Sequence, residues 1–157
     1  MTRNTPDRID LIRLARTDGI GPVNFRRLLD RHGHARAALE ALPHDAARAG
    51  RHPPHIPTID RVEDEIAATA RLGGRLIVRG DPDYPALLSA ISDAPPVLSV
   101  MGNAALLSAP GIGIVGARNA SAAGIRISEA LAAALAGAGL CVVSGLARGI
   151  DAAAHRA

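Results

Sequence analysis

Residues 111–151 read GIGIVGARNASAAGIRISEALAAALAGAGLCVVSGLARGID, and this stretch decides the fold class. Two short apolar runs, at 112–115 and 140–143, have the length of buried strands, and residues 125–138 between them have helical periodicity. A glycine-bearing loop follows each run, and a second helix is expected to begin near Asp151. This order predicts two parallel strands joined by a right-handed helical crossover, which is an α/β fold.

The chain before residue 111 is expected to be mainly helical. Apolar residues at helical spacing from Ile9 to Leu42 predict three short helices, separated by Gly-Ile-Gly-Pro at 19–22 and by His-Gly at 32–33. Prolines at 52–57 predict a linker or an extended crossover. Further along we expect a helix at 60–72, a strand at 76–78, a short helix near 86–91 and a strand at 97–100.

Composition narrows the class of partner. Hydrophobic residues make up 48% and charged residues 21% of the 157, a normal globular balance without a signal peptide or membrane span, so we expect a cytoplasmic protein. All 18 basic residues are arginine, and the net charge is +4 for residues 1–52, −3 for 53–110 and +2 for 111–157. One Phe, one Tyr and no Trp exclude an aromatic base-stacking platform. A polyanion would have to be bound by backbone amides and guanidinium groups.

A literal G-x-G-x-x-G occurs at Gly111, Gly113 and Gly116, but it does not predict a dinucleotide site. In a dinucleotide fingerprint the glycines follow the strand, whereas here residues 112–115 are themselves the predicted strand. The second strand is followed by Val143-Ser144-Gly145 and not by the acidic residue that would hold a ribose. We therefore expect no dinucleotide and no other cofactor.

The loops after the two predicted strands, residues 116–124 and 144–151, are the candidate site. Both lie at the carboxyl edge of a parallel sheet and lead into helix N-termini, where free amides and the helix dipole favour an anion. Arg118 and Arg148 add forked donors suited to phosphate. The alternative is that the small residues serve packing alone and that Asp151 is only an N-cap. The pair of arginines in matching loops favours a phosphate site.

A resemblance supports this interpretation. Ile114-Val115-Gly116-Ala117-Arg118, Gly124 and, above all, Ser144-Gly145-Leu146-Ala147-Arg148-Gly149-Ile150-Asp151 followed by His155 resemble the signature of the DNA-processing protein A (DprA/Smf) family. Asp83-Tyr84-Pro85, Pro95-Pro96-Val97-Leu98 and Gly102-Asn103 resemble the lead-in to that family's extended Rossmann domain. The resemblance implies a non-catalytic protein that binds single-stranded DNA and recruits the RecA recombinase in natural transformation, as a homodimer when intact.

The resemblance also implies an organisation and a set of site residues. Residues 1–52 would form a helical SAM-like domain, 53–110 a linker and lead-in, and 111–157 the first half of a Rossmann-like DNA-binding domain. Too few strands are present for a closed sheet, so we expect a piece of a longer protein, whose later part carries the RecA surface. The DNA-binding residues carried over are Gly116, Arg118, Gly124, Ser144, Gly145 and Arg148.

The turn near the N-terminus is a second candidate phosphate contact. Gly19 and Gly21 resemble the turn of a helix-hairpin-helix, whose exposed amides, with Arg26 and Arg27, would hold one phosphate. The alternative is a plain tight turn with proline near a helix start, and we favour this alternative because helical surfaces are commonly charged.

Neither a metal site nor a catalytic site is expected. The six histidines have no ligand spacing with Cys or carboxylate, so no metal is expected, and His155 is expected to hydrogen-bond Asp151 four residues earlier. No nucleophile-base pair is visible. The alternative function is a nucleotide-processing enzyme of the lysine-decarboxylase-like Rossmann group, a phosphoribohydrolase, whose P-G-G-x-G-T loop does not occur in this sequence.

Overall fold

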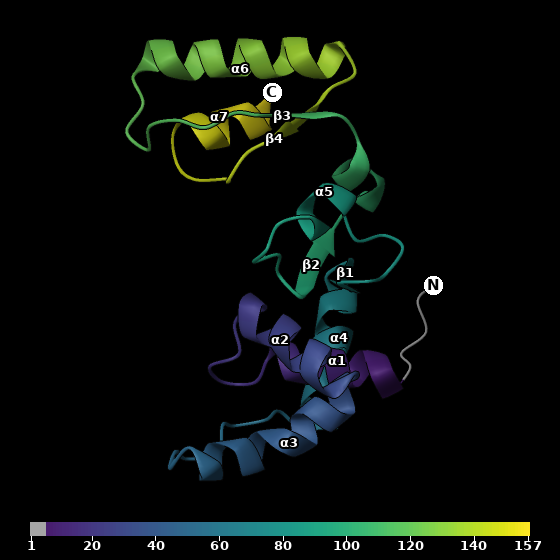
Figure 1. Cartoon of the computed structure of the whole chain (residues 1–157). Coiled ribbons are helices and arrows are strands. Elements are labelled where there is room, and N and C mark those ends of the chain that lie inside the picture. Colours follow the sequence, from purple (N-terminus) through teal and green to yellow (C-terminus); the bar gives the residue numbers. More distant parts are fainter. Residues whose placement is uncertain (1–5) are drawn as a thin grey trace. The chain divides into compact units, whose positions relative to one another are not determined.

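A computed structural model describes residues 6–157 in two compact units (Figure 1), unit 1 ending at Ala104 and unit 2 running from Ala105 to Ala157. Unit 1 contains α1 (Pro6–Ala15), α2 (Pro22–His32), α3 (Ala35–Arg48), α4 (Ile59–Arg71), β1 (Gly74–Val78), α5 (Ala86–Ser89) and β2 (Val97–Met101). Unit 2 begins in the short 3-10 helix η1 (Ala104–Ser108). It continues with β3 (Gly111–Gly113), α6 (Ala122–Gly137), β4 (Cys141–Val143) and α7 (Ile150–Arg156).

The three N-terminal helices are present, and local signals explain their ends. Pro22 occupies the first turn of α2, where a missing amide hydrogen costs nothing, and Gly33 ends that helix with a φ of +80°. The side chain of His34 caps α3 by accepting a hydrogen bond from the Ala37 amide at 3.3 Å. The expected end of the third helix at Leu42 is wrong, because α3 continues through Pro43 to Arg48.

Two hydrophobic clusters meet at α1. One packs α2 and α3 against α1 and consists of Leu14, Phe25, Ala35, Ala38, Leu39 and Leu42. The other packs α4 and the strands against α1 and consists of Ile9, Ile12, Val62, Leu76, Val78 and Val97. Ile12 and Leu14 are fully buried and lie in different clusters, so α1 is the helix around which unit 1 is organised.

Strands β1 and β2 form an antiparallel pair, with Gly74 opposite Met101 and Val78 opposite Val97. A buried arginine attaches this pair to α1: Arg8 donates to the Leu76 carbonyl oxygen at 2.6 Å and pairs with Asp81. The same carboxylate accepts a hydrogen bond from the Val78 amide at 2.8 Å. The hairpin is therefore part of unit 1, and the division of the chain at residues 52 and 110 stays a prediction.

Unit 2 has the predicted β-loop-α-β-loop-α order. Strands β3 and β4 are parallel, with Gly111 opposite Cys141 and Gly113 opposite Val143. Helices α6 and α7 pack against each other beside this pair (Figure 1). Their core is small: Ile114, Ala132 and Ala154 are buried and are joined by the half-buried Leu135, Val142 and Ile150.

The α/β fold class is confirmed, with a helical N-terminal part followed by a short mixed α/β region. The strand predicted at 112–115 is shifted in the structure, since β3 runs from Gly111 to Gly113. Gly111 and Gly113 of the G-x-G-x-x-G pattern therefore lie in the strand and do not form the loop of a dinucleotide site. Among residues 6–157 no helix combines the length and the apolar character needed to cross a bilayer.

Candidate functional site

The candidate site is formed by the two loops that follow β3 and β4. The first loop ends at Ser121, which caps α6 by accepting a hydrogen bond from the Gly124 amide at 3.1 Å. The second runs from Ser144 to Gly149 and leads into α7. Because β3 and β4 are parallel neighbours, their carboxyl ends bring both loops to the same edge of the sheet.

Asp151 joins the two loops. Its side chain is buried, and the two carboxylate oxygens accept hydrogen bonds from the Gly116 amide at 3.2 Å and the Gly145 amide at 3.1 Å. Each amide comes from a different loop, so a single carboxylate satisfies both. The alternative that Asp151 is only an N-cap is wrong: Gly149 occupies the N-cap position of α7, and Asp151 in its first turn bridges the two loops.

The backbones of the loops touch next to the two arginines. The Ile150 amide donates to the Ala117 carbonyl oxygen at 3.2 Å. Gly149 has a φ of +84°, and a Cβ there would collide with the carbonyl oxygens of Ala117 and Arg118, so only glycine fits. The loops are thus in direct contact one residue away from Arg148 and at Arg118 itself.

Both predicted arginines extend from this joined pair of loops. Arg118 and Arg148 are exposed, and neither forms an ion pair or a side-chain hydrogen bond with any residue in the described range 6–157. Of the two other arginines of unit 2, Arg156 pairs with Glu129 at 3.1 Å, whereas Arg126 of α6 is exposed and has no ion pair within residues 6–157. Two unpaired guanidinium groups on neighbouring, mutually bonded loops form a surface that attracts anions.

The backbone amides of the three predicted glycines, unlike the two arginine side chains, already donate hydrogen bonds within the protein. The amides of Gly116 and Gly145 donate to Asp151, and that of Gly124 donates to Ser121. Gly116 is required by packing as well, because a Cβ at this position would lie 2.6 Å from Cγ1 of Ile150. A role for these three glycines in phosphate binding stays a prediction, and among the predicted site residues the side chains of Arg118, Arg148 and Ser144 keep unused hydrogen-bond donors.

Ser144 and His155 adjoin the second loop. The Ser144 hydroxyl is buried and has no hydrogen-bond partner within residues 6–157. The expected hydrogen bond between His155 and Asp151 is wrong: His155 Nε2 lies 3.4 Å from the Ser144 carbonyl oxygen, because the Asp151 carboxylate is turned toward the two loop amides. Ser144 therefore remains a candidate whose hydroxyl has unused hydrogen-bonding capacity.

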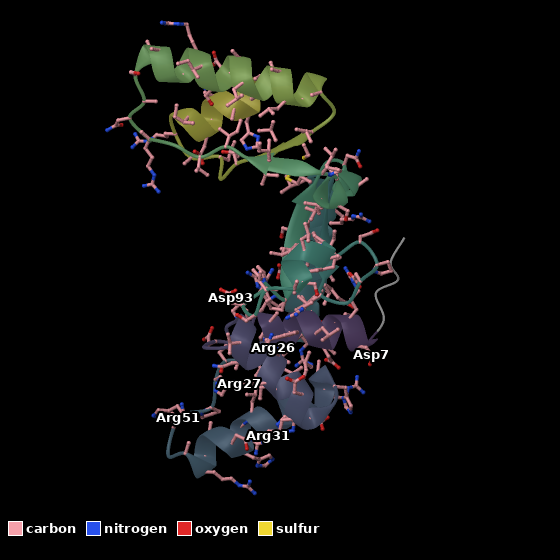
Figure 2. All side chains as sticks on the ribbon, turned by 45° about the horizontal axis from the view of Figure 1, so that its top comes forward. Asp7, Arg26, Arg27, Arg31, Arg51 and Asp93 are labelled. Carbon is pink, nitrogen blue, oxygen red and sulfur yellow. The ribbon has the colours of Figure 1, made fainter. Side chains whose placement is uncertain are left out.

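The two glycines of the predicted helix-hairpin-helix turn lie in unit 1, directly before α2. Gly19 has a φ of +75°, and Gly21 is the N-cap residue of α2. Arg26 is half-buried and Arg27 is exposed. Figure 2 labels both arginines, and Arg27, but not Arg26, lines a hollow beside this turn. The four residues predicted here are thus only partly brought together.

Sequence reasoning missed two features of the site. One is the bridge made by Asp151, which joins residues 35 positions apart and depends on the crossover. The other is Leu146, which is exposed and has a φ of +54°, an uncommon conformation for a residue other than glycine. No sequence signal marks Leu146, whereas an acid at the start of a helix after a glycine loop did mark Asp151. Within residues 6–157 no three His, Cys, Asp or Glu side chains are grouped as metal ligands would be.

Comparison with known proteins decides the family. The model of the family described as DNA recombination-mediator protein A matches residues 75–157, which is more than half of the chain. The chain belongs to this family. A second family model, described as a DprA-like N-terminal HHH domain, matches residues 5–68. The expected resemblance is therefore confirmed for the N-terminal helical part and for the part that follows it.

Individual members of the DNA recombination-mediator protein A family agree. A DprA relative from Mycobacterium tuberculosis is 36% identical over 151 residues, which cover 88% of this chain and 36% of the relative. DNA processing protein DprA of Streptococcus pneumoniae is 46% identical over 77 residues, covering 49% of this chain and 27% of that protein. The X-ray structure of DNA processing protein A from Streptococcus pneumoniae has a TM-score of 0.62 and 28% identity, covering 99% of this chain and 54% of the solved one. This chain thus spans about a third of the Mycobacterium tuberculosis relative.

Proposed function

We propose that this chain takes part in single-stranded DNA binding, with Arg118 and Arg148 contacting successive phosphates. The observation that carries the proposal is the pair of exposed, unpaired arginines on two loops that Asp151 and the Gly149 contact hold together. Phosphate groups spaced along a strand match two forked donors on one sheet edge better than a single small anion does. Membership in a family named for DNA recombination mediation supports the same substrate.

In this proposal the other candidate residues shape the loops. Gly116 and Gly145 let Asp151 reach both amides, Gly124 caps α6 through Ser121, and Ser144 supplies a hydroxyl beside the second loop. No nucleophile is needed, so the function is binding and not catalysis. A phosphate grip of this kind positions a strand without reading its bases, and we expect little sequence specificity.

The decisive experiment is a fluorescence-anisotropy titration of labelled oligo-dT at several salt concentrations. Arg118→Ala and Arg148→Ala are each expected to weaken binding about tenfold, the value of one charged hydrogen-bonded contact. Each should also reduce the slope of log K against log salt by about 0.7, the value for one single-strand phosphate. The matched control is Arg126→Ala, which removes an exposed arginine from α6 of the same unit.

The outcomes separate cleanly. If both loop variants bind like the unchanged chain while remaining folded, the loop assignment is wrong. If Arg126→Ala weakens binding as much as the loop variants do, the interaction is a general attraction to positive charge. Arg118→Lys and Arg148→Lys are expected to retain only part of the affinity, because an ammonium group lacks the forked geometry.

The later steps belong to the full-length protein. We propose that it acts in the cytoplasm as a homodimer and hands the bound strand to the RecA recombinase during DNA uptake. The rate at which RecA filaments form on a coated single strand tests the transfer, and an unchanged rate would contradict it. A phosphoribohydrolase is not favoured, since the matching families and relatives are those of DNA processing proteins.

A further inference from the structure

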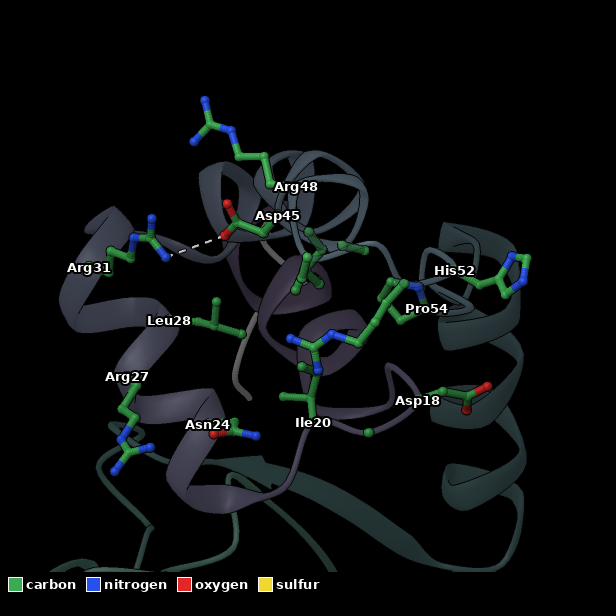
Figure 3. Close-up of a pocket in the computed structure, with 15 residues that line it drawn as sticks. Asp18, Ile20, Asn24, Arg27, Leu28, Arg31, Asp45, Arg48, His52 and Pro54 are labelled. Carbon is green, nitrogen blue, oxygen red and sulfur yellow. Dashed lines mark hydrogen bonds and ion pairs between the residues drawn. The ribbon is translucent and has the colours of Figure 1, made fainter.

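A hollow of about 640 Å³ lies in unit 1 between α2, the end of α3 and the extended segment after it (Figure 3). Its volume falls in the range of small-molecule sites. The residues that line it combine an apolar group with a charged one. The apolar group is Ile20, Leu28, Leu42, Ala46, Ala49 and Pro54, and the charged group is Asp18, Asp45, Arg27, Arg31, Arg48 and Arg51.

The charged residues leave positive charge unbalanced around the hollow. Four arginines face two aspartates, and Asp45 pairs only with Arg31, at 3.4 Å. Arg27, Arg48 and Arg51 are exposed and form no ion pair with any residue of the described range. The arginines in α1 and directly after it are different, since Arg8, Arg13 and Arg16 each bond a carboxylate. This excess of unpaired positive charge around the hollow favours a bound anion.

The side chains of α2 give the hollow an apolar group and an amide group in addition to its charges. Leu28 and the Asn24 amide face the hollow, whereas Arg27 and Arg48 project from its edge (Figure 3). Figure 2 shows Arg27, Arg31 and Arg51 at the same end of unit 1. An apolar floor with one amide suits a planar ring that has polar edges, and a rim of guanidinium groups suits phosphate. Inorganic phosphate alone would leave the floor unused.

We propose that this hollow is a second binding site, specific for a nucleoside phosphate. The base lies on Leu28 and Pro54 near the Asn24 amide, the phosphate lies beside Arg51, and Arg27 and Arg48 add positive charge at two different edges of the hollow. The ligand is either one residue of a nucleic acid strand or a free mononucleotide, which share this chemistry. The site is formed by unit 1 alone and does not depend on Arg118 or Arg148.

The test is a titration of the ¹⁵N-labelled 157-residue chain followed by amide chemical shifts. Inorganic phosphate, dTMP, oligo-dT and an abasic oligonucleotide of equal length are added in turn. Saturable shifts at Asn24, Leu28 and Ala49 with dTMP support a free nucleotide, and the same shifts with oligo-dT alone support a strand residue. Absence of shifts in the hollow with both would overturn the proposal. Equal affinity for inorganic phosphate and dTMP, or for abasic and complete strands, would also overturn it.

Charge-reversal variants test the rim. Arg48→Glu with Arg51→Glu is expected to weaken binding in the hollow by about tenfold or more. The matched control is Arg61→Glu with Arg71→Glu, which changes the net charge equally at two exposed, unpaired arginines of α4. An equal loss in both double variants would mean general electrostatic attraction and would overturn the site. Arg118→Ala should leave the hollow shifts unchanged, so that failure of the loop site and failure of the hollow are distinguishable.

Discussion

Gly116 lies where unit 2 has no room for a side chain, because a Cβ would come within 2.6 to 2.8 Å of three carbons of Ile150. Gly116→Ala is therefore expected to lower the free energy of unfolding by about 1–3 kcal/mol, the usual cost of overpacking. The control is Gly137→Ala at the end of α6, where nothing lies within 4 Å and alanine should stabilise by up to about 1 kcal/mol. Urea denaturation measures both, and equal effects of the two substitutions would contradict the packing role.

Tyr84 predicts a pH dependence for unit 1. Its hydroxyl donates to the Pro95 carbonyl oxygen at 2.6 Å, and burial raises the pKa of Tyr84 above its ordinary value of 10.0, with Arg79 opposing the shift. Above pH 10 the unfolded chain loses a proton that the folded chain keeps, so stability falls as the pH rises. Tyr84→Phe should remove this part of the slope. The chain has a single tyrosine, so tyrosinate absorbance reports the ionisation directly, and a titration midpoint at or below pH 10 would refute the prediction.

At the scale of residues, the sequence predicts the candidates better than their partners. Arg118 and Arg148 follow from loop position and residue type, and both are exposed as a binding role requires. The acceptors of the Gly116 and Gly145 amides could not be predicted, because Asp151 reaches Gly116 only after the crossover has brought the two loops together.

At the scale of elements, Pro43 is the clearest departure from sequence expectation. Proline has no amide hydrogen, so it cannot donate to the Leu39 carbonyl oxygen four residues earlier, and a sequence pattern stops the helix there. Packing on both sides overrides this preference: Leu42 is buried in the helical core, and Asp45 pairs with Arg31 of α2 at 3.4 Å. The pairing of β1 with β2 was likewise not predictable, because it depends on the core that both strands share with α1 and α4.

Pro43→Ala is expected to raise the melting temperature of unit 1, because it restores a helical hydrogen bond and relieves the clash of the ring with the preceding turn, a gain of about 1–3 kcal/mol. The matched control is Pro22→Ala at the first turn of α2. Proline suits that position, so its replacement should cost up to about 1 kcal/mol. Circular dichroism melts measure both variants, and a lower melting temperature for Pro43→Ala would contradict this account.

At the scale of the whole molecule, each unit has a core of its own, and the two cores differ in size. Unit 1 has two clusters built from large side chains, whereas the buried cluster of unit 2 consists of Ile114 and two alanines. Large apolar side chains such as Val115, Ile127 and Leu146 are exposed in unit 2. Periodicity predicts which segments become helices and strands, but it does not predict how little apolar surface a small unit buries.

We therefore expect unit 2 to unfold at a lower temperature than unit 1. Amide exchange measured residue by residue should show earlier loss of protection in α6 than in α1. Gly116→Ala should lower the transition of unit 2 and leave that of unit 1 in place. A single transition, with equal protection lost in both helices, would contradict separate unfolding.

Asp151 accepts a hydrogen bond from one backbone amide of each loop. The backbones beside Arg118 and Arg148 are therefore ordered during folding and not on contact with a ligand. A DNA strand that contacts both arginines then binds a surface that needs no rearrangement. The entropy lost in ordering the loops therefore does not reduce the binding affinity. Association should accordingly be a single phase whose rate rises linearly with concentration, and substitutions at the arginines should change chiefly the residence time.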